Sequence, residues 1–564
     1  MENTSAYFQE IIELLCKKKY SLKQVNQLKV QLCRKHNMKH IPTSIEIMFH
    51  ATPDKLKFLK KNILAKPTRS MSGVAPIAVM TAPFPCPHGK CIFCPGGPNS
   101  TFGNVPQSYT GKEPSTMRAI RGNYDPFLIV FNRLEQFIIS GHMPNKAEII
   151  VQGGTFPALP VEYQKEFITG IYQALNEFST QFFKADELRV EKIRTFFELP
   201  ADFTDEKRRV RLQKKILALK KKTTFLKEQK RNETAAIRCV GLTIETKPDW
   251  GFVEHGRNML ELGVTRIELG VQSVYEEPLK VCHRGHTIAD TQKSIQELKD
   301  LGFKLNYHYM LGLPGVTKEM EAVGLRQLFE NPAYKPDMLK IYPCMVMSGT
   351  PLYQLWKAGK FIPMTTTTAA ELIAEFMRYV PSYCRVMRVQ RDIPTYMTEA
   401  GVDRTNLRQY IDKIMQDKNI QTQEIRSREI ERVLYKNPEL VFKKPSIKIM
   451  EYNASGKEFF ISLEDNNALF GFVRMRFPSQ CLRKEITSQT ALIRELHVYG
   501  SATAFGKKGT VQHRGLGKQL MKTAEKIAKK YGKNKIVVIS AVGTREYYKK
   551  IGYKKEGVYM VRKI

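Results

Sequence analysis

The sequence contains no uninterrupted apolar run of the roughly 18 residues that a membrane-spanning helix requires. Its first 20 residues mix Glu and Lys and lack the apolar core of a secretory signal. We therefore exclude membrane-spanning and exported proteins and expect a cytoplasmic protein without a membrane partner. Low-complexity tracts and repeats of solenoid period are also missing, which excludes repeat architectures.

Cysteine and acidic residues are both scarce. The chain has 10 Cys in 564 residues, and three of them lie between Cys86 and Cys94 while the others are scattered singly. This pattern excludes a disulfide framework and indicates a metal or cluster site in a reducing compartment. Only 55 Asp and Glu stand against 90 Lys and Arg, a formal net charge of +35. So large an excess of positive charge indicates a polyanionic partner or substrate.

The chain is long enough for about three or four domains, and its 42% hydrophobic residues exclude wholesale disorder. Residues 1–70 carry apolar side chains at helical spacing between Lys and Arg, which predicts short amphipathic helices with a basic outer face. This face is either a solvated surface or a nucleic-acid contact, and the charge of the whole chain favours the contact.

Short apolar runs alternate with helical stretches across residues 71–393. They include IAVM at residues 77–80, EIIVQGG at 148–154 and RIELGVQS at 266–273. This alternation predicts a mostly parallel sheet, either open or closed as a barrel. Polar and Gly residues directly follow the apolar runs, so we expect the active site at the carboxyl ends of the strands.

Two segments differ from this alternation. Residues 182–237 predict an inserted basic helical arm, in which residues 207–231 hold twelve basic side chains and one acidic side chain. The arm is either a solvated helix face or a phosphate-binding surface. Residues 394–445 predict a helical linker, and residues 446–564 predict a short α+β domain.

The segment CPHGKCIFCPGG places Cys86, Cys91 and Cys94 on a loop directly after an apolar strand, with the spacing C-x4-C-x2-C. Three such thiolates are able to hold three irons of a 4Fe-4S cluster and to leave the fourth iron open. The alternative is a zinc site with His88 as the fourth ligand. The spacing alone does not decide between them, because C-x2-C occurs in both kinds of site.

Three Gly-containing motifs follow the cysteines in order: QGGT at residues 152–155, ELGVQS at 268–273 and MLGLPG at 310–315. Together with the cysteines they resemble the radical S-adenosylmethionine (SAM) enzymes, whose fold is a partial TIM-like barrel. The resemblance implies a 4Fe-4S cluster on the three cysteines and SAM bound by Gly153, Gly154, Thr155, Glu268 and Gln272. Members of that family usually space their cysteines x3 and then x2, so the extra residue here points to a subfamily.

A second glycine motif opens a predicted amphipathic helix near the C-terminus. Gln512, Gly515 and Gly517 lie in VQHRGLGKQL, where the start of the helix directs N–H groups at an anion such as a pyrophosphate. The alternative is a Gly-containing helix start without a ligand. Strand-like segments flank the motif and a Tyr-rich segment closes the domain: IRELHVYG at 493–500, IVVISAVG at 536–543 and REYYKKIGY at 545–553.

This order resembles the GNAT acetyltransferases over the last domain. The resemblance implies that Tyr548, with Tyr547 as its neighbour, lies beside a thioester sulfur, where a phenol is able to protonate a departing thiolate. The sequence does not decide which of the two Tyr residues faces the sulfur. The resemblance also implies acetyl-CoA contacts from a strand and from the following loop and helix, namely Glu495, Leu496, His497, Val498, Gln512, Gly515, Leu516, Gly517, Lys518 and Gln519.

A radical SAM domain followed by a GNAT domain in one basic chain resembles the family of Elongator catalytic subunits, which are tRNA uridine acetyltransferases. The shared segments include SYTGKEPSTMRAIRGNYDPF at residues 108–127, HRGHT at 283–287 and RVQRDIP at 388–394. The resemblance covers nearly the whole chain. It implies an α/β fold with three parts: a basic helical tRNA-binding segment (1–70), a radical SAM TIM-like partial barrel (71–393) and, after the linker, a GNAT α+β domain (446–564).

The activity that this resemblance implies is that of a tRNA carboxymethyluridine synthase. An adenosyl radical generated from SAM at the cluster removes a methyl hydrogen from acetyl-CoA, and the carbon radical adds to carbon 5 of the wobble uridine at position 34. Hydrolysis then releases CoA and leaves a carboxymethyl group. A radical route is needed because carbon 5 of uracil lacks the nucleophilic lone pair that GNAT enzymes acylate.

Further contacts and partners follow from the same resemblance. Lys146 corresponds to a lysine associated with acetyl-CoA, although a lone Lys reads equally as a solvated side chain. Arg118, Arg121, the N-terminal segment and the basic insertion are candidates for contacts with the tRNA backbone. The expected partners are tRNA and either other Elongator-type subunits or a second copy of the chain. Many relatives bind zinc near the linker, but residues 417–430 contain no Cys, so we expect no structural zinc.

Two alternative functions stay open at this point. In the first, the GNAT domain acetylates protein lysines directly, as histone acetyltransferases do, and the cluster domain is a scaffold. In the second, both sites have decayed and the chain is a tRNA-binding scaffold. The three thiols, the Gly loop and the Tyr pair argue against decay, because packing alone does not retain three thiols on one loop.

Overall fold

Seven parallel strands form the central sheet of the protein, for which a computed structural model describes residues 2–38, 41–42, 44–52, 55, 58–59, 73–199, 205–500 and 515–564. Within these residues β1 and β11 are the two edges of the sheet, so it is an open half-barrel and not a closed barrel. This confirms the predicted partial barrel. The order across the sheet is β1 (Ala75–Met80), β4 (Lys146–Gln152), β7 (Arg238–Thr246), β8 (Arg266–Gln272), β9 (Lys304–Leu311), β10 (Met338–Pro343) and β11 (Arg385–Arg388).

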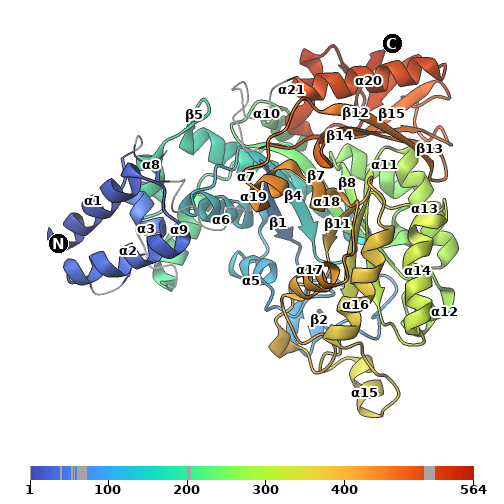
Figure 1. The fold of residues 1–564 in the computed structure, drawn as a ribbon, viewed down its shortest axis with the longest axis horizontal. Coiled ribbons are helices and arrows are strands. Elements are labelled where there is room, and N and C mark those ends of the chain that lie inside the picture. The colour runs from blue at the N-terminus through green and yellow to red at the C-terminus, as the bar shows by residue number, and fades with distance from the viewer. Residues whose placement is uncertain are drawn as a thin grey trace.

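Helices connect successive strands and cover the outer face of the sheet (Figure 1). Their starts carry side-chain caps: Asp125 accepts from two N–H groups at the start of α6, and Thr287 forms a capping box at the start of α13. The helices along the barrel are α5 (Pro114–Arg121), α6 (Pro126–Ile139), α7 (Val161–Phe182), α11 (Val253–Glu261), α12 (Glu276–Val281), α13 (Ile288–Asp300), α14 (Lys318–Glu330), α15 (Pro351–Lys357) and α16 (Thr366–Phe376). A small hairpin, β2 (Gly97–Ser100) with β3 (Gly103–Val105), follows the cysteine loop.

Side chains on the barrel strands alternate between an apolar outer face and a polar inner face. On β8, Ile267, Leu269 and Val271 are fully buried in the main hydrophobic core. Arg266 and Glu268 alternate with them and therefore point to the opposite face, into the lumen of the half-barrel. The lumen is thus lined with charged residues, which is where a polar ligand is able to bind.

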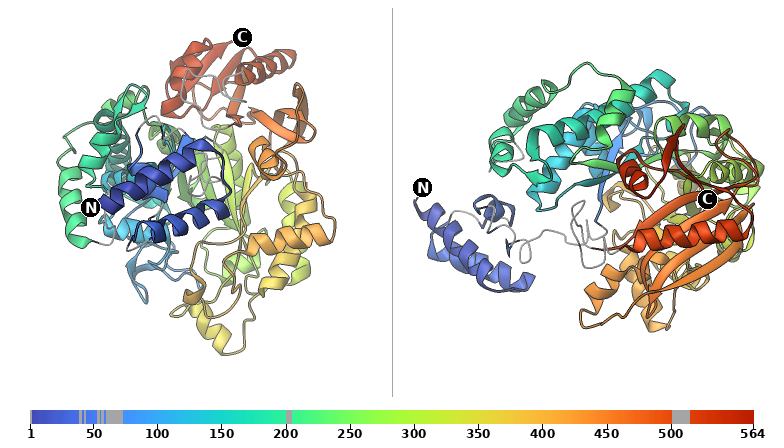
Figure 2. Two further views of the ribbon diagram at one scale, coloured as in Figure 1. Left: turned by 60° about the vertical axis from the view of Figure 1, so that its left-hand side comes forward. Right: turned by 90° about the horizontal axis from the view of Figure 1, so that it is seen from above.

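The N-terminal segment forms a small helical unit of its own. It consists of α1 (Glu2–Lys17), α2 (Leu22–Lys35) and α3 (Ser44–Phe49), whose apolar sides meet in a separate core that includes Tyr7, Ile11 and Leu15. Figure 2 shows these helices apart from the C-terminal domain. The predicted short amphipathic helices are therefore present, and tRNA binding by this unit stays a prediction.

The basic insertion is helical, as expected, but it packs against the barrel and does not project as an arm. A short hairpin of two-residue strands, β5 (Phe183–Lys184) and β6 (Glu187–Leu188), precedes its helices. The helices are α8 (Val190–Phe196), α9 (Glu206–Leu217) and α10 (Phe225–Asn232). Arg208 of α9 is buried and its guanidinium lies 3.1 Å from the Glu135 carboxylate of α6. Asn232 of α10 donates to Asn176 of α7 at 2.9 Å.

A second, mixed sheet forms the C-terminal domain. Only β15 and β16 pair in parallel, and the other neighbours are antiparallel. The sheet order is β12 (Ser446–Asn453), β13 (Lys457–Asp465), β14 (Ala468–Phe477), β15 (Thr490–Val498), β16 (Lys535–Val538), β18 (Tyr559–Lys563) and β17 (Lys554–Glu556), with α20 (Leu516–Lys530) and α21 (Arg545–Lys550). The linker before it contains α17 (Leu407–Asp417), α18 (Ile425–Arg428) and α19 (Ile430–Lys436). The predicted α+β domain is confirmed.

The C-terminal domain is joined to the barrel by buried ion pairs at the amino ends of the barrel strands. Asp337, directly before β10, lies 2.6 Å from Arg494 Nη2 of β15. Asp300, at the end of α13, lies 2.6 Å from Arg476 Nε of β14, and Glu458 contacts both arginines at 3.0 and 3.1 Å. All five side chains are completely buried. Because each charge has an opposite partner, this interface is a rigid joint.

None of the helices in the described part of the chain combines the length and the apolar composition needed to cross a membrane.

Candidate functional site

A cavity at the carboxyl ends of the barrel strands brings together the side chains that the sequence analysis selected for the cluster and for SAM. The cysteine loop after β1 supplies Cys86, Cys91 and Cys94, and the turn after β4 supplies Gly154 and Thr155. Their convergence follows from the parallel sheet, because all carboxyl ends meet at one edge. Further polar and charged side chains line the cavity, namely Gln107, Tyr109, Gln152, Glu245, Lys247, Glu268, Gln272, Arg284, His308, Lys340, Tyr342, Arg388 and Arg391.

The three thiols lie among hydrogen-bond donors and positive charge. Cys94 Sγ accepts from the Ser108 N–H at 3.2 Å, and Cys91 Sγ lies 3.4 Å from Arg284 Nη1 and 3.2 Å from His88 Nε2. Burial, together with the neighbouring thiols Cys94 and Cys91, raises the pKa of Cys86 to about 11. The three thiols therefore ionise together only when a cation such as an iron cluster lies among them.

A single zinc ion and an iron cluster require different spacings of the three thiols. Zinc bonds sulfur at about 2.3 Å, so two sulfurs of one tetrahedral site are about 3.8 Å apart. Within the described residues, Glu245, Glu268 and His308 form the one group of three His, Cys, Asp or Glu side chains whose ligand atoms all lie within 4.8 Å of one another. Cys86, Cys91, Cys94 and His88 do not form such a group, so their ligand atoms do not surround one point in this structure, and the three thiols on one loop are able to hold three irons of a cluster.

The Gly-Gly turn after β4 brings bare backbone to the cavity. Gly153 and Gly154 have φ values of +126° and +110°, and a Cβ at Gly153 would lie 2.1 Å from Thr81 Oγ1. No other residue fits at that position. Gln152 Oε1 and Gln272 Oε1 are buried and have no hydrogen-bond partner in the described part of the chain. Two unpaired acceptors beside bare backbone suit a ligand that carries amino and hydroxyl groups, as SAM does.

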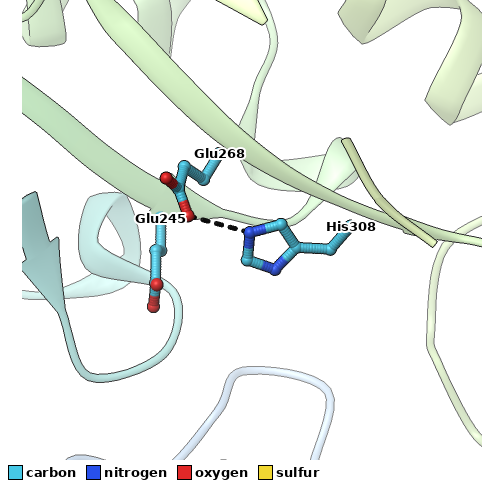
Figure 3. A group of neighbouring side chains, drawn as sticks. All are labelled: Glu245, Glu268 and His308. Carbon is cyan, nitrogen blue, oxygen red and sulfur yellow. Dashed lines mark hydrogen bonds and ion pairs between the residues drawn. The ribbon is translucent and has the colours of Figure 1, made fainter. Parts of the chain in front are cut away.

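Glu245, Glu268 and His308 line the same cavity on three adjacent strands (Figure 3). The Glu268 carboxylate accepts from His308 Nε2 at 2.9 Å and is in contact with the Lys340 ammonium. Although burial opposes ionisation, Lys340 and His308 hold the pKa of Glu268 well below its usual value. Burial and the Glu268 charge raise the pKa of Glu245 to about 7. Since Lys340 already supplies the cation, this group does not need a metal ion.

The C-terminal domain contains the second candidate site, at the start of α20. Gly515 adopts φ +83° as the residue that caps α20, and Gln519 N–H bonds back to its carbonyl at 3.0 Å. The first-turn N–H groups, which include those of Leu516, Gly517 and Lys518, have no intrahelical acceptor and are available to an anion. Gln512 lies outside the described residues.

Tyr547, and not Tyr548, points at this helix start. A Cβ added at Gly517 would lie 2.6 Å from Tyr547 Oη and 3.8 Å from Val498 Cγ2, so α20, β15 and α21 meet here. Tyr547 Oη is buried and has no hydrogen-bond partner among the described residues, and burial raises its pKa to about 12. Tyr548 instead packs into the hydrophobic core with its ring 6.0 Å from that of Tyr553.

On β15, the strand predicted to hold acetyl-CoA, some of the predicted side chains already contact other residues of the protein. The Glu495 carboxylate accepts from Arg474 Nε at 2.9 Å and lies 3.8 Å from Lys304 Nζ, so it belongs to the joint between the domains. The His497 ring stacks on Phe472 with 5.9 Å between centroids. Leu496 and Val498 are half-buried. A ligand along this strand would therefore meet backbone and apolar side chains more than charge.

Lys146 begins β4 and so lies at the amino end of the barrel, opposite to the cysteines. It is half-buried, and burial lowers its pKa. The C-terminal domain packs at the same end, since Gly543 abuts Arg238 and Cys239 at the start of the adjacent strand β7. Lys146 is thus on the side of the acetyl-CoA candidates.

Sequence reasoning missed several residues of the cysteine cavity. Arg284 and Arg391 lie in HRGHT and RVQRDIP, which were selected as shared segments without a role. Tyr109 likewise lies in the shared segment at residues 108–127, whereas Lys340 and Tyr342 carried no signal, because a single Lys or Tyr in a strand is common.

The chain matches four known protein families. Residues 4–71 match the ELP3 N-terminal domain, 84–324 the radical SAM superfamily, 336–417 the radical SAM C-terminal domain and 424–553 the acetyltransferase (GNAT) family.

Similar proteins extend over nearly the whole chain. It is 43% identical to the tRNA uridine(34) acetyltransferase of Methanocaldococcus infernus, over 96% of this chain and 95% of the relative. It is 38% identical to human Elongator complex protein 3, over 95% of this chain and 93% of the relative. Among solved structures, the archaeal Methanocaldococcus infernus Elp3 with an N-terminal deletion (1–46) aligns with a TM-score of 0.71 and 38% identity, over 88% of this chain and 100% of that one.

Proposed function

Because the chain belongs to the family of tRNA uridine(34) acetyltransferases and Elongator complex protein 3, we propose that it is a tRNA carboxymethyluridine synthase that acts on carbon 5 of uridine 34. It is an enzyme with a radical SAM domain and an acetyltransferase domain. The observation that carries the proposal is that one half-barrel bears a thiol-lined cavity at one end of its strands and an acetyltransferase domain at the other. The two proposed sites therefore belong to two domains that are joined by buried ion pairs.

In the first site, Cys86, Cys91 and Cys94 would hold a 4Fe-4S cluster. When bound, the cluster and SAM supply the one-electron chemistry that activates an unreactive C–H bond. The backbone of Gly153 and Gly154 and the unpaired acceptors Gln152 and Gln272 would bind the polar groups of SAM, with Thr155 and Glu268 beside them. Cys91, Cys94 and Glu268 are buried at this end, which limits the access of water to them.

In the second site, the start of α20 and strand β15 would hold acetyl-CoA. The first-turn N–H groups of Leu516, Gly517 and Lys518 would bind the pyrophosphate, with Gln512, Gly515 and Gln519 as further contacts, and the backbone of residues 495–498 would bind the pantetheine arm. The geometry favours Tyr547 over Tyr548 as the phenol beside the thioester, because its hydroxyl lies against Gly517 at the start of α20 while Tyr548 packs into the core. Lys146 would contact acetyl-CoA from the barrel.

The tRNA would bind through positive charge on several surfaces. Arg118 and Arg121 at the end of α5 and the N-terminal helices are the candidates that we retain. The basic insertion is a weaker candidate, because much of its charge is already paired: Arg211 and Lys215 contact Glu198, and Arg231 contacts Glu177 and Glu228. We further propose assembly with Elongator-type subunits or with a second copy of the chain.

Anaerobic incubation of the iron-reconstituted protein with reductant, SAM, acetyl-CoA and tRNA, followed by nucleoside mass spectrometry, tests the proposal. We expect carboxymethyluridine from the wild type and none from Cys91→Ser, which lacks one cluster ligand. Cys481→Ser is the matched control, because Cys481 is exposed and lies outside the cavity. Acetyl-lysine on added peptides from both variants, without modified uridine, would instead establish a protein acetyltransferase with a scaffold domain.

A further inference from the structure

The inner end of the basic insertion contacts the helix that carries Tyr547. Glu233 directly follows α10 and is buried, with 3% of its surface exposed. Its carboxylate accepts from Arg545 Nη1 and from Lys549 Nζ of α21, each at 3.1 Å. Although burial opposes ionisation, these two bonds hold the pKa of Glu233 below its usual value. One buried anion therefore binds two cations of the C-terminal domain.

These two cations flank Tyr547 on the same short helix. Arg545 and Lys549 are four residues apart and so share one face of α21, while Tyr547 points away from them to the start of α20. Arg545 is also buried, and Glu233 holds the carboxylate that neutralises it. Moving α21 away from Glu233 would leave the buried Arg545 without its carboxylate and Glu233 with only Lys230, which lies 3.3 Å away, so the helix has one favoured position.

The insertion is itself fixed to the barrel close to Glu233. The Asn232 amide donates to Asn176 at 2.9 Å and to the Ile237 carbonyl at 3.1 Å, and its oxygen accepts from the Cys239 N–H at 2.8 Å. Glu228 accepts from Asn176 at 2.7 Å. These bonds join α10, α7 and β7, so Glu233 is presented by a rigid part of the radical SAM domain.

We propose that Glu233 is a positioning residue for the acetyl-transfer site and that this is a function of the basic insertion. By binding Arg545 and Lys549, it sets α21 so that the Tyr547 hydroxyl lies over the start of α20. The proposal rests on the function proposed above for Tyr547. It also explains why a segment with a strong positive charge ends in a buried acid that points at the other domain.

The test compares Glu233→Gln with Glu546→Gln in the reconstituted full-length protein. Glu546 also contacts Lys549, at 2.6 Å, but it lies on α21 itself and does not join the two domains. We expect Glu233→Gln to lower kcat for tRNA-dependent acetyl-CoA turnover about 10- to 100-fold, as a displaced reacting group does, with KM for acetyl-CoA changed less than about threefold. SAM cleavage to 5′-deoxyadenosine should stay at the wild-type rate in both variants.

A double-mutant cycle with Tyr547→Phe tests whether Glu233 acts by positioning Tyr547 or only by stabilising the domain. If Glu233 acts through Tyr547, the double variant should be no slower than Tyr547→Phe alone. Additive losses, or a kcat for Glu233→Gln equal to that of Glu546→Gln, would overturn the proposal. An unchanged kcat in Tyr547→Phe would instead overturn the role proposed for Tyr547. Should Glu233→Gln fail to fold, Lys549→Met takes its place, because it removes one of the two bonds and leaves the buried Arg545 pair intact.

Discussion

The two ends of the half-barrel both contain buried charge, but they use it in opposite ways. At the amino ends, Asp337, Asp300 and Glu458 are each matched by arginines of the C-terminal domain, and all are fully buried. At the carboxyl ends, thiols crowd together, glutamine oxygens lack partners within the described chain, and Glu245 has a raised pKa. Opposite charges pair between the domains at the end that holds the molecule together, whereas the end that receives ligands leaves acceptors of the described chain without partners.

Breaking the paired end should have the largest effect on stability. Asp337→Ala leaves Arg494 and Arg474 buried with too little negative charge, and removing one partner of a buried pair costs about 3–5 kcal/mol. We expect a large fall in the unfolding temperature of the C-terminal domain, measured by differential scanning calorimetry. Asp392→Ala is the control, since Asp392 pairs with Arg388 at an exposed position. Equal losses in both variants would contradict the contrast between the two ends.

Relieving the unpaired end should stabilise the protein in a pH-dependent way. The pKa of Glu245 is about 7 in the folded protein and 4.5 in a free side chain, so folding favours its protonated form. The wild type therefore loses stability as the pH rises from 4.5 through 7, and Glu245→Gln does not. We expect the variant to be more stable by about 2 kcal/mol at pH 8.5 and equal near pH 4.5, measured by thermal unfolding.

Glu268→Gln serves as the opposite control for this experiment. Its carboxylate is the partner of Lys340, so its neutralisation should destabilise the protein at pH 8.5. A Glu245→Gln variant that is less stable than the wild type at pH 8.5 would show that the hydrogen bond from Tyr109 Oη, 3.3 Å from the carboxylate, outweighs the cost of burying its charge.

Removing an ion pair at the surface should change the stability least, and it gives a reference for the effects at the two ends of the barrel. Hydrogen bonds from Lys215 and Arg211 lower the pKa of Glu198 to about 2, but all three side chains are accessible to solvent. Solvent screens such pairs, and we expect Glu198→Gln to change the free energy of unfolding by less than about 1 kcal/mol. Denaturant titration at low and high salt measures this. A loss of unfolding free energy as large as that of Asp337→Ala would mean that charge pairing determines the loss whether or not the pair is buried.

Much of the ligand-binding end was predictable from the sequence, because its residues directly follow the strands that place them. Cys86, Cys91 and Cys94 follow β1, and Gly153 and Gly154 follow β4, so the parallel order alone brings them to one edge. The strand alternation and the Gly-containing helix start indicated the two domains in the same local way.

The paired end was not predictable, because its partners are far apart in the chain. Asp337 and Arg494 are 157 residues apart, and nothing local marks either of them as a partner. The same holds for Glu495, whose carboxylate accepts from Arg474, 21 residues away in the chain. Adjacent residues of one helix point in different directions, so only the packing of α21 separates Tyr547 from Tyr548.

Because the seven barrel strands run in the same direction, the residue number within a strand indicates how far a side chain lies from the amino end of the barrel. On β9, Lys304 lies at the end that meets the C-terminal domain, His308 lies in the cavity, and Asn306 lies between them. Every second residue faces the lumen, and each step of two moves about 6.6 Å towards the cysteines. The position of a natural substitution within a barrel strand therefore predicts which part of the molecule it affects. A lumen-facing change near the amino end affects the joint with the C-terminal domain, and one near the carboxyl end affects the cysteine cavity.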